Sequence, residues 1–544
     1  MLSSSQHIEY RRNKIVTKNT MSRLSGKVCS ILLAIVIATG MSFAQDYTLN
    51  GNVTNNGTIR VRRDVINNTT ALVSITGTGV VQLRGTVGAI TAHALRSTTG
   101  TYPISMTNLD LIDNRPTTCQ VDITVSNNLR IGDGTTAYTA AGAGFSIGAR
   151  TLTLNNLSSC MATSTAALTF SGGIVVFNSA ASQLILNNAA GVTYGALTLS
   201  LAGAKSITAG GTVTAATVTQ TGGQLSVTEN IDVTSSGSFS DIGPISAAKK
   251  LRLTAAATSC SITSMNNSNT GTFENASSGP ATITTLVGNT GTINQSGGTP
   301  GTIAITNAAT NTGIITSTST GSVIFNNTIA NNTPGTISNT STGTITFTNN
   351  LSGSGTVSQT AGGTMNVAGA FIQNIYSLTG ANGTVVYNGI GAQSIVSTSY
   401  YHLTISTTAG IATASAALTL TGNLVVNSPS TLDMASFNTS TFPGPSNNNA
   451  GVIQWSGNNV YVSGAGTTEF YSAAIGNVAA GANYGSLLFS GTGVKTFAAS
   501  PMTATGTMTV NAGASVTVGV ALQINGNVNN SGAITNNSSI TIGN

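Results

Sequence analysis

Five short stretches of the chain run from a small polar turn into an apolar residue: Asn269-Thr270-Gly271-Thr272-Phe273, Asn289-Thr290-Gly291-Thr292-Ile293, Asn311-Thr312-Gly313-Ile314-Ile315, Thr333-Pro334-Gly335-Thr336-Ile337 and Gly353-Ser354-Gly355-Thr356-Val357. The central glycines of these stretches are 20, 22, 22 and 20 residues apart. A second series inside the same repeats, at Gly301, Gly321, Gly343 and Gly363, has spacings of 20, 22 and 20. Because both series keep nearly the same spacing, residues 268–373 form a repeat of constant circumference.

A repeat this short cannot bury its own apolar face, so it is stable only when neighbouring units stack. Stacking at about 4.8 Å per unit predicts two inward columns of apolar side chains. The columns are Ile293, Ile315, Ile337 and Val357, and Ile303, Val323, Ile345 and Met365. Gly and Asn are expected at the corners because they accept positive φ. The pattern therefore predicts an all-β fold, a parallel β-helix or β-solenoid with about 20–22 residues per coil.

Two alternatives to this architecture fit the sequence less well. A serial array of hairpins would show two-residue Asn-Gly turns between strands of equal length, whereas the gaps within each repeat are uneven. Disorder is typical of chains that are poor in β-branched residues and rich in proline. Here only 6% of the 544 residues are charged and 63 are glycine, but Thr, Val and Ile recur throughout and prolines number only 10.

The first 44 residues have the organisation of a leader with a signal peptide. Arg23 and Lys27 precede an apolar run over 28–39, and Ser42-Phe43-Ala44 has the small-x-small form of a cleavage site. Met21 is the expected start and cleavage is expected after Ala44. A retained anchor is the less favoured alternative, since the run is short for a membrane helix. The sequence thus predicts an exported protein, at the cell surface or outside the cell, with no membrane span in the mature chain.

Removing this leader changes the charge of the protein. The leader carries six of the 19 Lys and Arg and one of the 13 Asp and Glu, so the mature chain keeps 13 positive and 12 negative residues. No Lys or Arg occurs between Leu253 and Val494. Nucleic-acid binding requires clustered cations that neutralise phosphates, so we exclude that function. The cluster Arg60, Arg62 and Arg63 is expected to be a solvated face.

A longer module occurs three times around the regular segment. One copy reads Gly383-Thr384-Val385-Val386-Tyr387-Asn388-Gly389, then Gln393, then Tyr401-His402-Leu403-Thr404-Ile405-Ser406. The other two copies continue into Gly203-Ala204-Lys205-Ser206 and into Gly493-Val494-Lys495-Thr496. The copy near residue 400 has Thr407-Thr408-Ala409-Gly410 and lacks the lysine, so we expect the lysines to be corner or surface residues rather than ligand-binding groups.

These motifs resemble the β-strand repeats of adhesin-like exported surface proteins of Gram-negative bacteria, across residues 170–500. The resemblance implies a cell-surface or extracellular location and an attachment or matrix role, and it brings no catalytic residues. We predict a structural or adhesion-type repeat protein without catalytic activity. A carbohydrate-binding or polysaccharide-degrading β-helix protein is the alternative, with glycans or other surface proteins as candidate partners. The expected parts are the leader 1–44, an irregular β region 45–170, a repeat module 171–267, the regular solenoid 268–373 and further modules 374–544, so that the solenoid is segmented.

The two ends of the mature chain have similar sequences. Leu49-Asn50-Gly51-Asn52-Val53 is matched by Ile524-Asn525-Gly526-Asn527-Val528, and the similarity extends to Ile59 and Ile534. A solenoid normally needs a terminal cap, and the sequence stops just after a strand-like segment at 539–542. Either a longer protein continues beyond it or a partner covers it, and self-association through the solenoid ends is a candidate contact.

We expect no catalytic, cofactor-binding or metal-binding residues. Acid catalysis on polysaccharides needs paired carboxylates. The better pair is Asp110 with Asp113, near Arg115, but a self-capping turn is favoured there. The pair of Glu229 and Asp232 has no cation close in sequence. Asp133 stands outside any tandem calcium repeat.

The remaining candidates are also expected to be structural. Gly144-Phe145-Ser146-Ile147-Gly148 has the letters of a nucleophile elbow, but a strand-like segment follows it instead of a helix. The spacings of Cys119, Cys160 and Cys260 match no metal motif, and we expect small buried hydrophobes, or one disulfide and one free thiol. The lone histidines are His93 and His402. The aromatic residues Tyr387, Tyr400, Tyr401, Tyr461 and Trp455 could stack on sugars, although filling corners or insertions is favoured.

Overall fold

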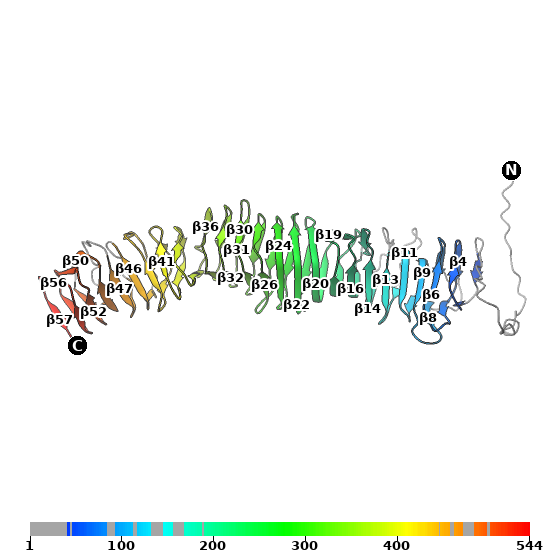
Figure 1. Ribbon diagram of the computed structural model, residues 1–544, viewed down its shortest axis with the longest axis horizontal. Coiled ribbons are helices and arrows are strands. Elements are labelled where there is room, and N and C mark those ends of the chain that lie inside the picture. Colours follow the sequence, from blue (N-terminus) through cyan, green and yellow to red (C-terminus); the bar gives the residue numbers. More distant parts are fainter. Residues whose placement is uncertain are drawn as a thin grey trace, which may run out of the picture.

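The computed structural model describes residues 41–43, 46–83, 93–112, 117–131, 145–155, 168–187, 190–444, 446–456, 462–471, 483–497 and 501–543. Every regular element in these ranges is a β-strand, and the assigned ladders are parallel throughout. Figure 1 shows them stacked side by side into one elongated rod. Across the same ranges no helix is long and apolar enough to cross a membrane. The predicted parallel β-solenoid is therefore confirmed.

The first part of the rod contains strands that range from two to fifteen residues in length. The N-terminal strands are β1 (Met41–Phe43), β2 (Tyr47–Leu49), β3 (Val53–Thr54), β4 (Thr58–Val61), β5 (Asp64–Asn67), β6 (Val73–Thr76), β7 (Val80–Leu83), β8 (His93–Ser97), β9 (Ile104–Leu111), β10 (Thr117–Cys119), β11 (Ile123–Ile131), β12 (Phe145–Ser146) and β13 (Thr151–Leu154). Next come β14 (Leu168–Asn178), β15 (Gln183–Ile185), β16 (Val192–Ser200), β17 (Lys205–Ile207), β18 (Val213–Gln220), β19 (Leu225–Val227), β20 (Ile231–Ile245), β21 (Lys250–Leu253) and β22 (Ser259–Asn267).

The regular segment contains β23 (Thr272–Asn275), β24 (Pro280–Asn289), β25 (Thr292–Gln295), β26 (Thr302–Ile305), β27 (Ala309–Asn311), β28 (Ile314–Ser317), β29 (Ser322–Phe325), β30 (Ile329–Asn331), β31 (Thr336–Asn339), β32 (Thr344–Phe347), β33 (Leu351–Ser352), β34 (Thr356–Gln359) and β35 (Thr364–Val367). The last part contains β36 (Ile375–Ser377), β37 (Thr384–Tyr387), β38 (Gln393–Ile395), β39 (Ser399–Tyr400), β40 (His402–Ile405), β41 (Ile411–Ala414), β42 (Thr419–Leu420), β43 (Leu424–Val426), β44 (Thr431–Asp433), β45 (Asn448–Asn449), β46 (Val452–Trp455), β47 (Thr467–Phe470), β48 (Asn483–Tyr484), β49 (Ser486–Phe489), β50 (Gly493–Phe497), β51 (Met502–Ala504), β52 (Met508–Val510), β53 (Ala514–Val518), β54 (Leu522–Ile524), β55 (Val528–Asn530), β56 (Ala533–Asn536) and β57 (Ile540–Ile542).

Each regular coil has three strands, which form three faces of the rod. In one coil these are β26, β27 and β28, and they pair with β29, β30 and β31 of the next coil. Paired residues such as Ile303 and Val323, or Ile315 and Ile337, lie 20 or 22 residues apart. The spacing of the sequence repeat is therefore the circumference of the coil.

The predicted inward columns are confirmed. Ile293, Ile315, Ile337 and Val357 are aligned in register and fully buried, as are Ile303, Val323, Ile345 and Met365. Full burial of such a side chain contributes about 1.5–3 kcal/mol relative to exposure. These columns belong to one apolar core that extends from Leu49 to Ile524.

The expectation that corner glycines supply positive φ is wrong at the leading positions. Gly291, Gly313 and Gly355 do not have positive φ. A Cβ on Gly313 would instead overlap the backbone carbonyl oxygen of Gly291 in the preceding coil. Glycine is required there because consecutive coils approach each other closely at the corner, not because the backbone is left-handed.

Buried asparagines form a hydrogen-bonded column at one corner. The Nδ2 of Asn289 donates to the Oδ1 of Asn311 at 2.8 Å, and the Nδ2 of Asn311 donates to the Oδ1 of Asn331 at 2.8 Å. Asn267 donates to Asn289 at 3.3 Å, and Asn331 donates to the Oε1 of Gln373 at 2.8 Å. All four asparagines are at most 1% exposed. This asparagine ladder satisfies turn carbonyls that would otherwise be buried without a donor.

A second polar column occupies the next corner. It aligns Asn275, Gln295, Ser317, Asn339 and Gln359, each of which is buried. The Nδ2 of Asn275 reaches the Oε1 of Gln295 at 2.9 Å, while the Oγ of Ser317 bonds only within its own coil, to Gly321 O at 3.0 Å and Ser319 O at 3.3 Å. The amides of Gln295, Asn339 and Gln359 likewise donate to carbonyl oxygens of their own turns, so this column, unlike the asparagine ladder, is bonded mainly within each coil.

Candidate functional site

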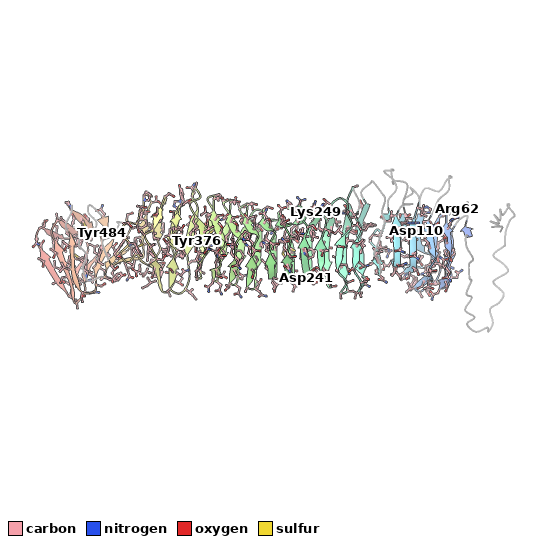
Figure 2. All side chains as sticks on the ribbon, turned by 90° about the horizontal axis from the view of Figure 1, so that it is seen from above. Arg62, Asp110, Asp241, Lys249, Tyr376 and Tyr484 are labelled. Atoms are coloured by element: carbon pink, nitrogen blue, oxygen red, sulfur yellow. The ribbon has the colours of Figure 1, made fainter. Side chains whose placement is uncertain are left out.

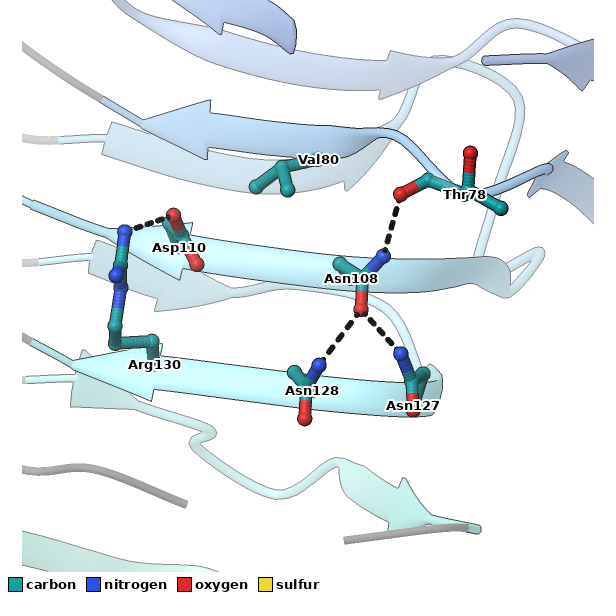
Figure 3. A pocket seen from close by; sticks show the side chains of 7 residues that line it. All are labelled: Thr78, Val80, Asn108, Asp110, Asn127, Asn128 and Arg130. Carbon is teal, nitrogen blue, oxygen red and sulfur yellow. Dashed lines mark hydrogen bonds and ion pairs between the residues drawn. The ribbon is translucent and has the colours of Figure 1, made fainter. Parts of the chain in front are cut away.

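A polar groove lies near the N-terminal end of the rod, where β7, β9 and β11 are adjacent (Figure 3). It has a volume of about 360 Å³. Its lining residues are Thr78, Val80, Asn108, Asp110, Asn127, Asn128 and Arg130. All of them except Thr78 are carried by these three strands. The groove is thus built on regular strands.

A β-bulge in β11 creates the amide side of the groove. The pairing of β11 with β9 shifts between Val125 and Asn128, so that Ser126 and Asn127 of β11 lie opposite the single residue Thr107 of β9. Asn127 in the bulge and Asn128, which pairs with Asn108, both donate to the Oδ1 of Asn108, at 2.9 and 3.2 Å. Bulges commonly re-aim side chains in this way. The Nδ2 of Asn108 donates to Thr78 O and Gly79 O, at 3.3 and 2.9 Å.

An ion pair forms the other side of the groove. A terminal nitrogen of Arg130 lies 2.6 Å from the Oδ2 of Asp110, which also accepts a hydrogen bond from the Nε2 of Gln82 at 3.3 Å. Asp110 is only 5% exposed. The buried Nε of Arg130 has no hydrogen-bond partner in the described structure. The sequence identified Asp110 as a candidate catalytic acid but did not identify Arg130 as its partner. The other two residues of that candidate site, Asp113 and Arg115, lie outside the described residues.

The second acid pair has cations nearby in the structure, although none is close in sequence. Glu229 bonds to the Nζ of Lys249 at 2.6 Å, and Asp232 holds Arg252 in a two-point contact at 3.0 and 2.7 Å. Each partner is 20 residues further along the chain, which is one coil away and therefore not close in sequence. Figure 2 shows Asp110 and Lys249 at separate places along the rod, so these pairs do not belong to one site.

Other residues singled out in the sequence have structural surroundings. Cys119 and Cys260 are free and buried, and burial raises the pKa of Cys260 to about 12. Ser146 ends the short strand β12, and β13 follows after a turn, so no nucleophile elbow forms. Asp133, Gly144 and Cys160 lie outside the described residues. In the described part of the chain, no three His, Cys, Asp or Glu side chains gather as a metal site.

The candidate sugar-stacking aromatics are mostly interior. Tyr387, Tyr400 and Trp455 are at most 1% exposed. The hydroxyl groups of Tyr387 and Tyr400 lie 3.1 Å apart, and that of Tyr400 donates to Val396 O at 3.0 Å. These rings therefore fill the core from strands β37, β39 and β46, instead of filling corners or insertions as the favoured interpretation had it. Tyr401 packs edge-on against His402, and Tyr461 lies outside the described residues.

The module lysines are neither surface residues nor turn residues, because Lys205 begins β17 and Lys495 lies within β50, and their ammonium groups bond to carbonyl oxygens of the preceding turns. Lys205 and Lys495 are 0% exposed. The Nζ of Lys495 donates to Ser490 O at 2.7 Å and lies 3.3–3.4 Å from the carbonyl oxygens of Gly491, Thr492 and Gly493. Gln183 is paired in register with Lys205, one coil earlier, and Gln393 is paired in the same way with Ala412 in the copy without the lysine. The Nε2 atoms of Gln183 and Gln393 donate to backbone carbonyl oxygens of Leu154 and Val367, so long side chains with N–H donors recur at this corner.

His402 should make the stability of its coil depend on pH. Its Nδ1 accepts a hydrogen bond from Asn423 N at 2.9 Å, and burial lowers the pKa of its imidazole. Between pH 6.5 and the lower folded pKa the unfolded chain binds more protons, so stability falls as pH falls through this window. We expect a lower melting temperature at pH 5.5 than at pH 7.5. His402→Asn keeps an acceptor and should reduce this difference; an unchanged difference in the variant would contradict the assignment.

Comparison with known proteins gives no relative. No family model, no curated protein and no solved structure matches this chain.

Proposed function

We propose that this chain is an exported, extracellular or cell-surface structural protein of the adhesion type, without catalytic activity, in which the rod itself is the working part. The observation that supports this most is the continuous apolar core from Leu49 to Ile524. At about 21 residues per coil, 500 residues make roughly 24 coils and a rod on the order of 115 Å long. The motif resemblance to adhesin-like repeats points to the same role.

The chemistry of the surface agrees with a passive rod. Each carboxylate in the described ranges has an ion-pair or hydrogen-bond partner, for example Asp64 with Arg96 at 2.9 Å and Glu469 with Gln454 at 2.6 Å. From Asn275 to Leu432 the sequence contains no Asp, Glu, Lys or Arg. Such a surface offers hydroxyl and amide groups for contact and few free groups for acid–base chemistry.

The location and role can be tested in the producing bacterium. We expect the mature chain, beginning at Gln45, outside the inner membrane and accessible to protease added to intact cells. Cells lacking the protein should attach less to a surface, and the added protein should restore attachment. Retention in the cytoplasm, or unchanged attachment, would refute the proposal.

The enzymatic alternative has its own measurement. A polysaccharide-degrading β-helix would release new reducing ends from a polysaccharide panel, and Asp110→Ala would abolish that release. We expect no release by the wild-type chain. Release that depends on Asp110 would overturn the structural proposal.

We also propose a second copy of this chain as a partner at the solenoid ends. In the described structure β55, β56 and β57 each pair on one side only. Their sequences contain no charge and no proline, which natural edge strands commonly use to prevent pairing. The strands β2, β3 and β4 begin 475 residues before β54, β55 and β56, so the two end coils have the same strand spacing.

This contact has a direct test. Cleavage after Ala44 would remove β1, which pairs with β4, and would free the β2–β4 edge to stack on β55–β57. Head-to-tail contacts of this kind do not close and so form filaments. Sedimentation of the mature chain should show assembly that increases with concentration, and Thr535→Lys with Thr541→Lys should abolish it. A monomer at every concentration would exclude the contact. Equal assembly of the wild type and the double-lysine variant would exclude it as well.

A further inference from the structure

The groove between β7, β9 and β11 contains hydrogen-bonding groups that the protein leaves unused. Asn108 is 6% exposed and its amide is saturated by Thr78, Gly79, Asn127 and Asn128. The Nδ2 atoms of Asn127 and Asn128 donate to Asn108. Among the described residues, no donor bonds to the Oδ1 of Asn127 or to the Oδ1 of Asn128. In Figure 3 the Oδ1 atoms of Asn127 and Asn128 point away from Asn108. Asn108 thus serves as a buried anchor that fixes two outward acceptors.

Donor groups lie at the other end of the same groove. Arg130 uses one terminal nitrogen on Asp110, at 2.6 Å, and its buried Nε has no partner in the described structure. The Arg130 side chain as a whole is 40% exposed, so a ligand in the groove can reach its exposed part but not the buried Nε. Val80, on the neighbouring strand β7, adds an apolar side chain to the lining of the groove (Figure 3).

The electrostatics of the groove narrow the class of ligand. Arg130 and Asp110 neutralise each other, and the other lining residues are uncharged. A phosphate or sulfate group would need an unpaired cation, and Arg130 is already paired. A metal ion would need free carboxylates, and the Oδ2 of Asp110 is already bonded to Arg130 and Gln82. What remains is a neutral ligand that presents donors and acceptors together.

We propose that this groove binds a neutral saccharide unit. Sugar hydroxyls both donate and accept, so they match the Oδ1 acceptors of Asn127 and Asn128 at one end and the partly exposed Arg130 side chain at the other. The C–H face of the ring can pack against Val80. A volume of about 360 Å³ lies within the range of small-ligand sites. The inference deepens the proposed adhesion-type function, on which its biological meaning rests, by naming the ligand class and the place of contact.

The test uses the mature chain with neutral oligosaccharides and with sialylated or sulfated versions of the same glycans. We expect binding to a subset of the neutral glycans, and about tenfold weaker binding for Asn127→Ala and for Asn128→Ala, because each removes one acceptor and loosens the anchor. The control is Asn307→Ala, an exposed asparagine that donates to Thr285 on another part of the rod. That variant should bind as the wild type does.

Several outcomes would overturn the proposal. They are no binding by any neutral glycan, stronger binding by the charged versions, or equal losses for Asn307→Ala and the groove variants. Circular dichroism and melting temperature of each variant establish that it is folded. If Asn128→Ala loses no affinity although the protein still mediates attachment, the groove assignment fails and the adhesion proposal stands. If the chain stays inside the cell, the adhesion proposal fails whatever the glycan result.

Discussion

Replacing Asn311 by alanine should destabilise the coils around it by about 3–5 kcal/mol, because it would leave several buried polar groups without partners. Asn311 accepts from Asn289 and donates to Asn331 and to Gly313 O at 3.0 Å, and it is 0% exposed. Each buried group that loses its partner costs about 1–3 kcal/mol. Because coils contact only their neighbours, the damage should be largest in this segment of the rod.

The measurement is denaturant unfolding combined with amide hydrogen exchange. Protection should fall in β27 and β30, next to Asn311, and be retained near β52 and β53. The matched control is Thr310→Ala, since Thr310 precedes Asn311 in the same strand but is exposed. We expect its effect to stay within about 0.5 kcal/mol. Equal effects of the two substitutions would mean that the asparagine ladder adds no stability.

Replacing Lys495 by methionine should cost a similar amount, about 3–5 kcal/mol, although the volume is nearly kept. Four backbone carbonyl oxygens face its ammonium group, and methionine offers them no donor. Lys495→Gln should recover much of the loss, because Gln183 and Gln393, one coil earlier in the other two modules, also donate to backbone carbonyl oxygens at this corner. The Nε2 of Gln393, for instance, donates to Val367 O at 2.9 Å.

Thermal unfolding of the wild type and the two variants separates this role from simple packing. If only the volume and apolar packing of the side chain at position 495 mattered, methionine would lower the melting temperature less than glutamine. If the donors matter, glutamine is the milder change. A melting temperature of Lys495→Met equal to that of the wild type would show that the carbonyl oxygens find other partners.

The buried apolar columns could be predicted from the sequence because their residues recur at a nearly constant spacing. The spacing of Ile315 and Ile337 is the coil circumference, so a count of residues along the chain gives the register of the sheet. The buried polar columns could not be predicted in this way. Asn289 and Asn311 look like turn residues, and only the stacking of coils turns them into a buried ladder.

The lysines and the groove were missed for related physical reasons. A lysine is rarely buried unless it is paired, and the partners of Lys495 are backbone carbonyl oxygens, which no side-chain motif reveals. The groove depends on the bulge in β11, which arises from its mismatch with β9. The one available signal was the doublet of Asn127 and Asn128 in an otherwise alternating strand.

The parallel stacking of coils has a consequence under mechanical load. The hydrogen bonds between coils run along the rod, so pulling on its two ends loads them one coil at a time instead of shearing many together. Each coil that peels away releases about 21 residues, or on the order of 70 Å of extended chain. The rod should therefore yield in even steps at nearly constant force and lengthen many times over.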